Sequence, residues 1–398
     1  MTTTKSKRGL SIGALLFGVI ALLGAGQAVL DNEADAKART VRAPRFEVDP
    51  LWPKPLPNHW LLGMTIGVWV DEQDHVWIIH RGTPTLHANE RALDLKVGEC
   101  CTAAPPVLVF DQAGNLVRAW GGPGQGYEWP ESNHGIHVDH KGNVWIGGNG
   151  PKDAQLLKFT KDGKFLLQVG GHDKNASSND LENFGRVAKI WVDPKTNEAY
   201  VADGYKNKRI AVLDADTGKM KRFWGAYGNK PDDAPMPAYD PAAPLAQQFR
   251  NPVHCADLSN DQQLYVCDRV NNRIQVFTPQ GKFIKEQVYT KDTKNAGSVW
   301  DVAFSKDPEQ RYMYIADGVN EKVKIVDRQT LKELTNFGDG GRQPGQFYGA
   351  HSIATDSKGN IYTTETYEGK RVQRFLFKGV GPVTSQNQGA AGVWPASR

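Results

Sequence analysis

Three histidines stand at equivalent places in a repeated pattern of this 398-residue chain. His134, His254 and His351 each lie five residues before the polar residue that ends a short apolar segment. Three imidazoles that converge on one point can bind a transition metal and leave one position open for water or substrate, which is the catalytic zinc arrangement. We therefore predict a metal site, with Zn²⁺ favoured for an all-imidazole set and Cu, Fe or Ni as alternatives.

A second set of polar residues follows one strand later in the pattern, where a loop should border the same site. Arg81 and Arg269 are the cations of this set, and a guanidinium near a metal suits two-pronged capture of a carboxylate. Tyr205 belongs to the same set and could act as a general base beside a cation. We predict these three as catalytic or substrate-binding residues.

Other polar residues of the pattern have structural interpretations. Asp203, Asp268 and Asp317 come at the ends of strands, and we expect them to accept backbone N–H bonds in turns. His137 follows His134 by three residues but lies off the shared position, so we interpret it as structural.

The elements that must position these residues are short strands in a unit repeated six times between about residues 60 and 378. In each copy an apolar strand ends at a polar turn, and a second strand with an aromatic residue near its start follows. Units of roughly 46 to 68 residues with Lys-Gly-Asn or Asp-Gly turns are typical of four-stranded propeller blades. The copies cover 67–82, 135–150, 189–205, 255–270, 301–319 and 352–367.

Six such units predict an all-β, six-bladed β-propeller rather than a β-sandwich, which lacks a repeated pattern of this kind. The residue five places before each turn then lies at the start of the innermost strand, where six blades meet the channel. Histidine occupies every second blade, so threefold symmetry brings the three imidazoles to the axis. The six residues in this column are Ile66, His134, Ala188, His254, Trp300 and His351.

The N-terminus differs from the rest of the chain. A basic start is followed by the small and apolar stretch 10–26, which is the order of a secretory signal, although the stretch approaches the length of a membrane anchor. We predict a signal peptide or anchor with its cleavage region over 1–36, a linker over 37–61, the propeller over 62–378 and a tail over 379–398. The protein is expected to be exported, periplasmic or secreted, and membrane-bound only if the leader is retained.

The composition is that of an ordinary globular protein, with 39% hydrophobic and 23% charged residues. The formal net charge is only +4, which gives no electrostatic footprint for nucleic acid. Arg81 and Arg269 beside a cation would instead favour a small anionic substrate, which could be peptide-derived.

The four cysteines and one long loop leave alternatives open. Cys255 and Cys267 lie on neighbouring strands, and we favour a disulfide between them in an exported protein. The adjacent Cys100 and Cys101 could be reduced, bonded to each other, or part of a soft-metal site. The proline-rich loop 229–244 could be a lid, but a simple insertion between blades is favoured.

The ordered set of these motifs resembles the peptidyl-α-hydroxyglycine α-amidating lyases and the NHL-type six-bladed propellers around them. The match covers about 62–378 and includes IIHRG, NHGIHVDHKGNVW, VDPKTNEAYVADGYKNKRI, PVHCADLSNDQQLYVCDRVNNRIQVF and GAHSIATD. The resemblance implies a Zn²⁺ held by His134, His254 and His351, with Tyr205 as base. It also implies that Arg81 and Arg269 bind the carboxylate and carbonyl oxygens of a carbinolamide, which the family cleaves to an amide and glyoxylate.

The chain also departs from the family pattern. Ser352 follows His351 where the family has an aspartate that helps to hold a structural Ca²⁺, so calcium is in doubt here. The insert 83–105 does not resemble the lyases, and no copper monooxygenase domain is recognised in the sequence. A related lyase acting on another carbinolamide or α-hydroxy acid is therefore also compatible with the residues.

Two other function classes compete with a zinc-dependent lyase. Many NHL propellers are non-catalytic platforms that bind a protein or a glycan, and fold alone does not fix function. A metal-dependent hydrolase or lactonase is the third possibility, but such a site normally needs a carboxylate-rich Ca²⁺ centre, and the imidazole column argues against it.

Overall fold

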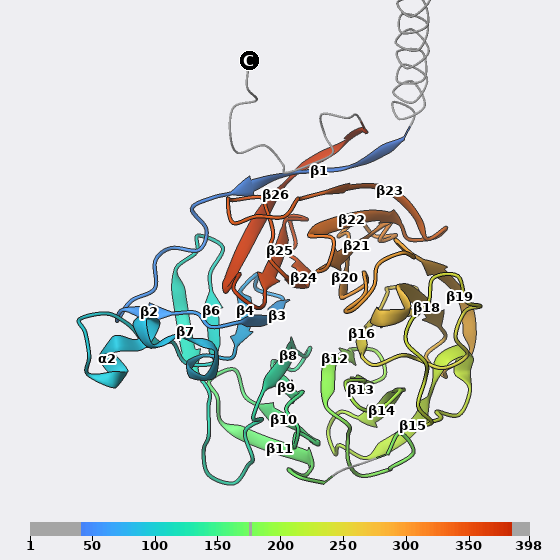
Figure 1. Cartoon of the computed structure of the whole chain (residues 1–398), viewed down its shortest axis with the longest axis horizontal. Helices are drawn as coiled ribbons and strands as arrows, with labels where there is room; N and C mark the ends of the chain where they lie inside the picture. The colour runs from blue at the N-terminus through green and yellow to red at the C-terminus, as the bar shows by residue number, and fades with distance from the viewer. Residues whose placement is uncertain (1–40, 175–176, 384–398) are drawn as a thin grey trace, which may run out of the picture.

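The computed structural model describes residues 41–174 and 177–383, which contain six four-stranded antiparallel sheets arranged around a central axis (Figure 1). The predicted six-bladed β-propeller is confirmed. The first three blades are β3(Thr65–Val70), β4(Val76–His80), β6(Val107–Phe110) and β7(Leu116–Trp120); β8(Asn133–Val138), β9(Val144–Gly148), β10(Gln155–Phe159) and β11(Phe165–Gly170); and β12(Val187–Asp193), β13(Glu198–Asp203), β14(Arg209–Asp214) and β15(Met220–Trp224). The next three are β16(Val253–Leu258), β17(Leu264–Asp268), β18(Arg273–Phe277) and β19(Phe283–Val288); β20(Asp301–Phe304), β21(Tyr312–Asp317), β22(Lys322–Asp327) and β23(Lys332–Phe337); and β24(Ala350–Thr355), β25(Ile361–Glu365), β26(Arg371–Pro382) and β1(Arg42–Asp49).

In the first, second and sixth blades the repeated turn is fixed by a bond between its acidic residue and the aromatic residue of the next strand. Trp77 Nε1 donates to Asp71 Oδ2 at 3.0 Å, and Trp145 Nε1 donates to Asp139 Oδ2 at 2.9 Å. The acids also accept backbone N–H bonds of their own turns. The same six-residue spacing therefore explains why an acidic turn and an aromatic residue recur together in the sequence.

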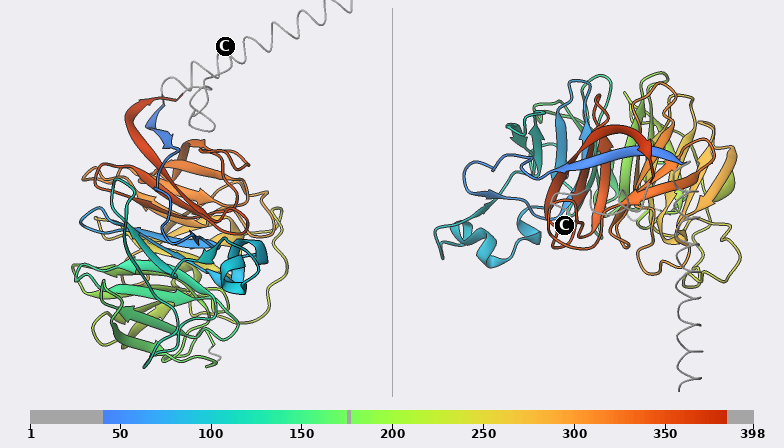
Figure 2. Two further views of the ribbon diagram at one scale, coloured as in Figure 1. Left: turned by 90° about the vertical axis from the view of Figure 1, so that its left-hand side faces the viewer. Right: turned by 90° about the horizontal axis from the view of Figure 1, so that it is seen from above.

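The ring is closed by strands from the two ends of the described chain. β1 pairs antiparallel with β26, and Arg42 lies opposite Pro382 (Figures 1 and 2). The linker predicted over 37–61 is therefore wrong for residues 42–49, which are the outer strand of the sixth blade, and the tail predicted from 379 begins later because β26 runs to Pro382. The paired residues of β1 and β26 are more than 300 positions apart in the sequence, so no local pattern could reveal that they form one blade. The signal or anchor over 1–36 and the end of the tail over 384–398 lie outside the described residues.

An insert projects from the rim beside the first blade (Figures 1 and 2). It contains the short helices η1(Thr83–Thr85), η2(Ala88–Arg91) and α2(Ala92–Leu95) and the strand β5(Thr102–Ala103), which pairs in parallel with β2(Trp60–Leu61). Cys100 and Cys101 are bonded to each other in this insert. Of the three alternatives left open by the sequence, the structure has the vicinal disulfide.

The predicted disulfide in the fourth blade is confirmed. Cys255 on β16 and Cys267 on β17 are direct partners in the strand register, with Cα atoms 4.8 Å apart, and their sulfurs are bonded. Disulfide bonds persist in oxidising compartments. The described part of the chain is therefore suited to an oxidising environment.

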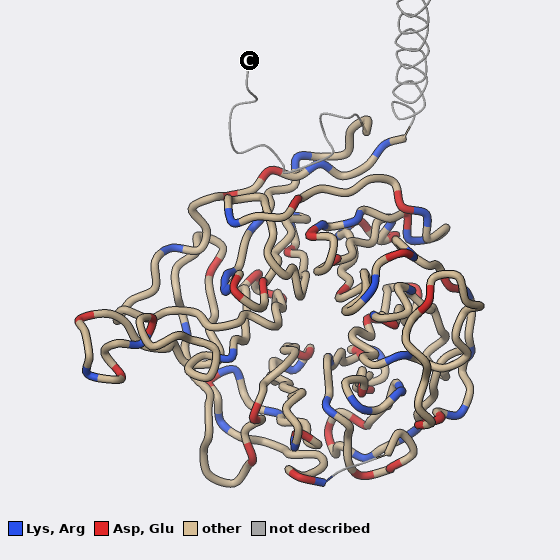
Figure 3. The backbone as a smooth tube through the Cα atoms, viewed as in Figure 1, with Lys and Arg blue, Asp and Glu red and all other residues tan. Residues whose placement is uncertain are grey.

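Lys and Arg are interspersed with Asp and Glu along the backbone around the ring (Figure 3). This agrees with the small net charge of +4. The helices within residues 41–174 and 177–383 are all short, and none of them could span a bilayer.

Candidate metal and active site

The three predicted histidines meet at one mouth of the channel. His134, His254 and His351 are the second residues of the innermost strands β8, β16 and β24. Their ring centroids are 5.1, 4.8 and 4.9 Å apart, so they form a nearly equilateral triangle, and their potential ligand atoms all lie within 4.8 Å of one another. The threefold arrangement predicted from alternate blades is what the structure has.

An irregular ladder accompanies each histidine at the start of its strand. The register with the neighbouring strand shifts between His134 and Ile136, between Val253 and Cys255, and between Ala350 and Ser352. Such irregularities bend a strand locally and change the direction of a side chain. They allow these histidines to face the axis although the strands around them are packed in the core.

The intervening blades orient the imidazoles through backbone carbonyls. The Nδ1 atoms of His134 and His351 lie 2.6 Å from the carbonyl oxygens of Ala188 and Ile66, and His254 Nδ1 is bound to the carbonyl of Trp300. These three acceptors are the other members of the column that contains the histidines. A carbonyl can only accept, so each Nδ1 carries the proton and each Nε2 keeps a lone pair for a metal or an acidic hydrogen.

Burial keeps the three imidazoles neutral. Each is 3% exposed or less, and burial lowers the pKa of each well below 6.5, with Arg81 and Arg269 lowering those of His134 and His351 further. Neutral imidazole is the form that binds a metal ion. The donor set therefore fits a transition metal that takes three nitrogen ligands.

The Tyr205 hydroxyl lies beside two of the three histidines, next to the nitrogen atoms that could hold a metal ion. Its oxygen is 3.0 Å from His134 Nε2 and 3.1 Å from His254 Nε2, and Arg269 Nη1 donates to it at 3.3 Å. The Arg269 guanidinium stacks on Trp300, with its Cζ 4.4 Å from the ring centroid. Its buried Nε finds no hydrogen-bond partner among the described residues, so Arg269 retains a donor for a ligand.

Arg81 also borders the site but is held by a partner that the sequence did not single out. Its Nη2 donates to Asn149 Oδ1 at 2.8 Å, and the same oxygen accepts from Ser132 Oγ at 2.8 Å. Burial lowers the pKa of Arg81, while Tyr205 and Tyr367 counter the shift, which places both phenols near the guanidinium. The sequence predicted that Arg81, Arg269 and Tyr205 border one site, but it did not single out Asn149. Asn149 directly follows the second strand of its blade, as Arg81 does in the first blade.

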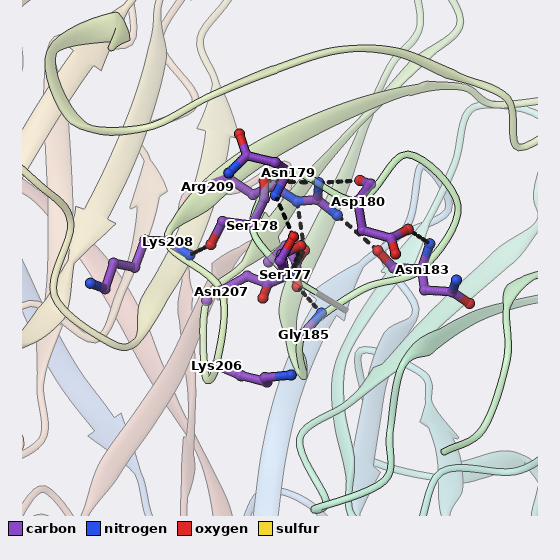
Figure 4. A network of polar contacts seen from close by, with 12 residues as sticks. Ser177, Ser178, Asn179, Asp180, Asn183, Gly185, Lys206, Asn207, Lys208 and Arg209 are labelled. Carbon is purple, nitrogen blue, oxygen red and sulfur yellow. Dashed lines mark hydrogen bonds and ion pairs between the residues drawn. The ribbon is translucent and has the colours of Figure 1, made fainter. Parts of the chain in front are cut away.

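A buried polar network fixes the turn that carries Tyr205 (Figure 4). Asp203 accepts from the backbone N–H of Gly185 at 2.6 Å, from Asn207 Nδ2 at 2.8 Å and from Arg209 Nε at 2.8 Å. Arg209 in turn donates to backbone carbonyls of the preceding loop, including Asn183 at 2.9 Å. The turn 204–208 is therefore held rigidly between two strands.

The structural interpretation of the other aspartates and of His137 is also confirmed. Asp203, Asp268 and Asp317 accept backbone N–H bonds from Gly185, Arg250 and Asn320. His137 Nε2 accepts from the backbone N–H of Val192 at 3.1 Å and links β8 to β12.

The loop predicted as a lid or an insertion is fastened to the third blade. Lys208 Nζ donates to the carbonyls of Asp232 at 3.0 Å and Ala234 at 2.7 Å, and Ser178 is bonded to the Asp233 carboxylate. These bonds favour the simple insertion over a moving lid.

His80 connects the first blade to the insert and gives the fold a defined sensitivity to acid. Its Nδ1 accepts from the backbone N–H groups of Gly63 and Gly82, its Nε2 lies 2.9 Å from the Pro105 carbonyl, and burial lowers its pKa to about 4. The unfolded chain takes up a proton near pH 6.5 whereas the folded protein does not until about pH 4. Stability is therefore lost as the pH falls through this window, by up to roughly 3 kcal/mol.

Urea unfolding measured between pH 7 and pH 5 checks this expectation. His80→Asn keeps an acceptor near the Nδ1 position but does not titrate, so its stability should depend less steeply on pH than that of the parent protein. The histidine triangle contributes equally to both proteins. If the unfolding free energy of the two proteins changed equally with pH, the role assigned to His80 would be contradicted.

The described chain is thus a six-bladed β-propeller with a buried trihistidine cluster, a tyrosine and two arginines at one channel mouth. No family model matches the chain. Among known proteins it is similar to peptidylglycine alpha-amidating monooxygenase of Rattus norvegicus, with 28% identity over 238 residues that make up 58% of this chain and 22% of that protein. It is also similar to NHL repeat-containing protein 3 of Homo sapiens (25% identity, 60% of each chain) and to the probable peptidyl-alpha-hydroxyglycine alpha-amidating lyase pgal-1 of Caenorhabditis elegans (26% identity, 36% of each chain).

These relatives confirm the resemblance to amidating-lyase-like, NHL-repeat propellers. The chain spans 22% of the length of the rat amidating monooxygenase, so that protein's whole activity does not transfer with the match. Among solved structures, a streptogramin B lyase covers 86% of this chain and 99% of its own at 13% identity and a TM-score of 0.49, a likeness too weak to bear on function.

Proposed function

We propose that this protein is an exported, zinc-dependent lyase that cleaves the C–N bond of a carbinolamide related to α-hydroxyglycine. The observation that carries the proposal is the triangle of three neutral imidazoles with the Tyr205 hydroxyl 3.0 and 3.1 Å from two of them and Arg269 donating to that hydroxyl. The similarity to amidating enzymes supports the same reaction class.

The trihistidine set supports a resident Zn²⁺. Each Nδ1 is bound to a carbonyl, so His134, His254 and His351 each offer Nε2, and three protein ligands leave a position for a substrate oxygen. When bound, the ion would polarise that oxygen as a Lewis acid.

The chain's own residues account for the remaining steps. The substrate is R–CO–NH–CH(OH)–COO⁻, and Tyr205 is positioned to take the hydroxyl proton. As the C–O bond becomes a carbonyl, the C–N bond breaks and its electron pair goes to nitrogen, which receives the proton that Tyr205 took from the hydroxyl. The products are R–CO–NH₂ and glyoxylate, and the atoms balance without water. Arg269 with its free Nε and Arg81 would bind the carboxylate.

Export is supported by the disulfides Cys100–Cys101 and Cys255–Cys267 and by the signal-like order of residues 1–36. The two arginines support a small anionic substrate, and the net charge of only +4 gives no support to a nucleic-acid partner.

The test is glyoxylate release from an N-acyl-α-hydroxyglycine by the Zn²⁺-loaded protein. Glyoxylate and the free amide should appear in equal amounts and much faster than with Zn²⁺ alone. A small α-hydroxy acid without the amide nitrogen serves as the comparison substrate. Aldehyde formation from that acid alone would point to the related lyase, and no turnover of either, despite bound metal, would favour a binding platform.

A further inference from the structure

Two carboxylates gather in the channel next to the histidine triangle. Oxygen atoms of Asp257 and Asp301 and the sulfur of Cys255 all lie within 4.8 Å of one another, which is the spacing of a metal-binding group. Cys255 is bonded to Cys267 and is not available as a ligand. Asp301 lines the same small cavity as the three histidines.

An ammonium group of the chain already lies between these carboxylates. Lys189 Nζ is 2.6 Å from Asp301 Oδ1 and 2.9 Å from the carboxylate of Asp257, and the three side chains are 3 to 7% exposed. Burial lowers the pKa of Lys189, but the two carboxylates outweigh it and the pKa is raised. The two ion pairs therefore favour the charged form of Lys189.

The remaining oxygen of Asp301 is bound as well. Ser352 Oγ donates to Asp301 Oδ2 at 2.6 Å, and the backbone N–H of Ile353 donates to the same atom at 3.1 Å. Ser352 is the residue that stands where the resemblance implies a calcium-binding aspartate. Here it offers a donor to a carboxylate rather than an oxygen to a metal ion, so these residues do not fit Ca²⁺.

We propose that the Lys189 ammonium is a built-in structural cation that takes the place of a bound metal ion and makes the core of this propeller independent of calcium. It links β12 of the third blade to β16 of the fourth and β20 of the fifth, and Ser352 connects the sixth blade to the same centre. A second cation at this position would be repelled by the ammonium at a distance of a few ångströms.

The same ion cluster supports the histidine triangle. Ala188 and Trp300 directly precede Lys189 and Asp301, and their carbonyls orient His134 and His254. The cluster therefore fixes the backbone at two of the three carbonyls that hold the imidazoles. This role is independent of the reaction proposed above.

Thermal unfolding of the full chain tests the proposal, in buffer stripped of divalent ions, resupplied with Zn²⁺, and with or without millimolar Ca²⁺. The midpoint of the parent protein should change by less than about 1 °C on addition of Ca²⁺. Lys189→Met leaves two buried carboxylates without their cation and should lower the midpoint by roughly 5 to 10 °C. Lys158→Met is the matched control, because Lys158 is also buried but contacts no carboxylate: its Nζ donates to the Ala215 carbonyl and lies over the Trp145 ring. The midpoint of this variant should fall by less than that of Lys189→Met.

The double variant Lys189→Met, Asp257→Asn separates charge from packing and remains measurable if the single variant does not fold. Removing one of the two unpaired charges should raise the unfolding midpoint part of the way back toward that of the parent protein. Calcium-dependent stabilisation of the parent protein, a loss in Lys189→Met no larger than in Lys158→Met, or a double variant no more stable than Lys189→Met would each overturn the proposal.

Discussion

His134→Ala should lose tightly bound metal while the propeller stays folded. Two imidazoles cannot hold the ion as three do, and we expect affinity for Zn²⁺ to fall by at least about 100-fold and the purified variant to contain less than half an equivalent. Metal analysis after gel filtration, together with circular dichroism of the same sample, measures both properties. The expected loss is large because His134 is buried and its Nδ1 is already committed to the Ala188 carbonyl.

His87→Ala is the matched control for this variant. His87 lies exposed on the insert, away from the triangle, and its removal should leave the metal content unchanged. Full metal content in folded His134→Ala would rule out the trihistidine site.

Tyr205→Phe should keep the metal and lose the reaction. The substitution removes one oxygen from a side chain that is already packed, so the metal content should match that of the parent protein. Because the hydroxyl is the group positioned to take the substrate proton, we expect kcat for glyoxylate release to fall by roughly 100- to 10,000-fold. The measurement is steady-state kinetics on samples with equal bound Zn²⁺.

Tyr348→Phe provides the comparison, since Tyr348 is an exposed tyrosine outside the triangle. Its kcat should be unchanged. A kcat for Tyr205→Phe within about threefold of the parent value would remove Tyr205 from the proton-transfer role and require another base.

The six-fold repeat and the triangle were predictable because both depend on local patterns. Each blade carries its own polar turn residue, and aligning the six copies on that residue is enough to place His134, His254 and His351 at the same position. The disulfide between Cys255 and Cys267 was predictable for the same reason, since the two residues lie on adjacent strands of one blade.

The features that escaped prediction depend on groups without a sequence signature or on distant residues. The carbonyls of Ile66, Ala188 and Trp300 are backbone atoms, so the intervening members of the histidine column gave no hint of their role. Lys189 stands in an otherwise apolar strand, and its partner Asp301 lies more than 100 residues away. Only the convergence of inner strands on the channel brings such residues together.

The pairing of β1 with β26 determines when the molecule can finish folding. Residues 42–49 are synthesised before their partner strand, so the sixth blade stays open until residues 371–382 exist. Contacts between such distant segments slow folding, and the unpaired edge of β26 or of β1 is exposed to other chains until they meet. A nascent chain therefore carries an open ring, and truncation before residue 371 would leave that ring without its closing strand pair.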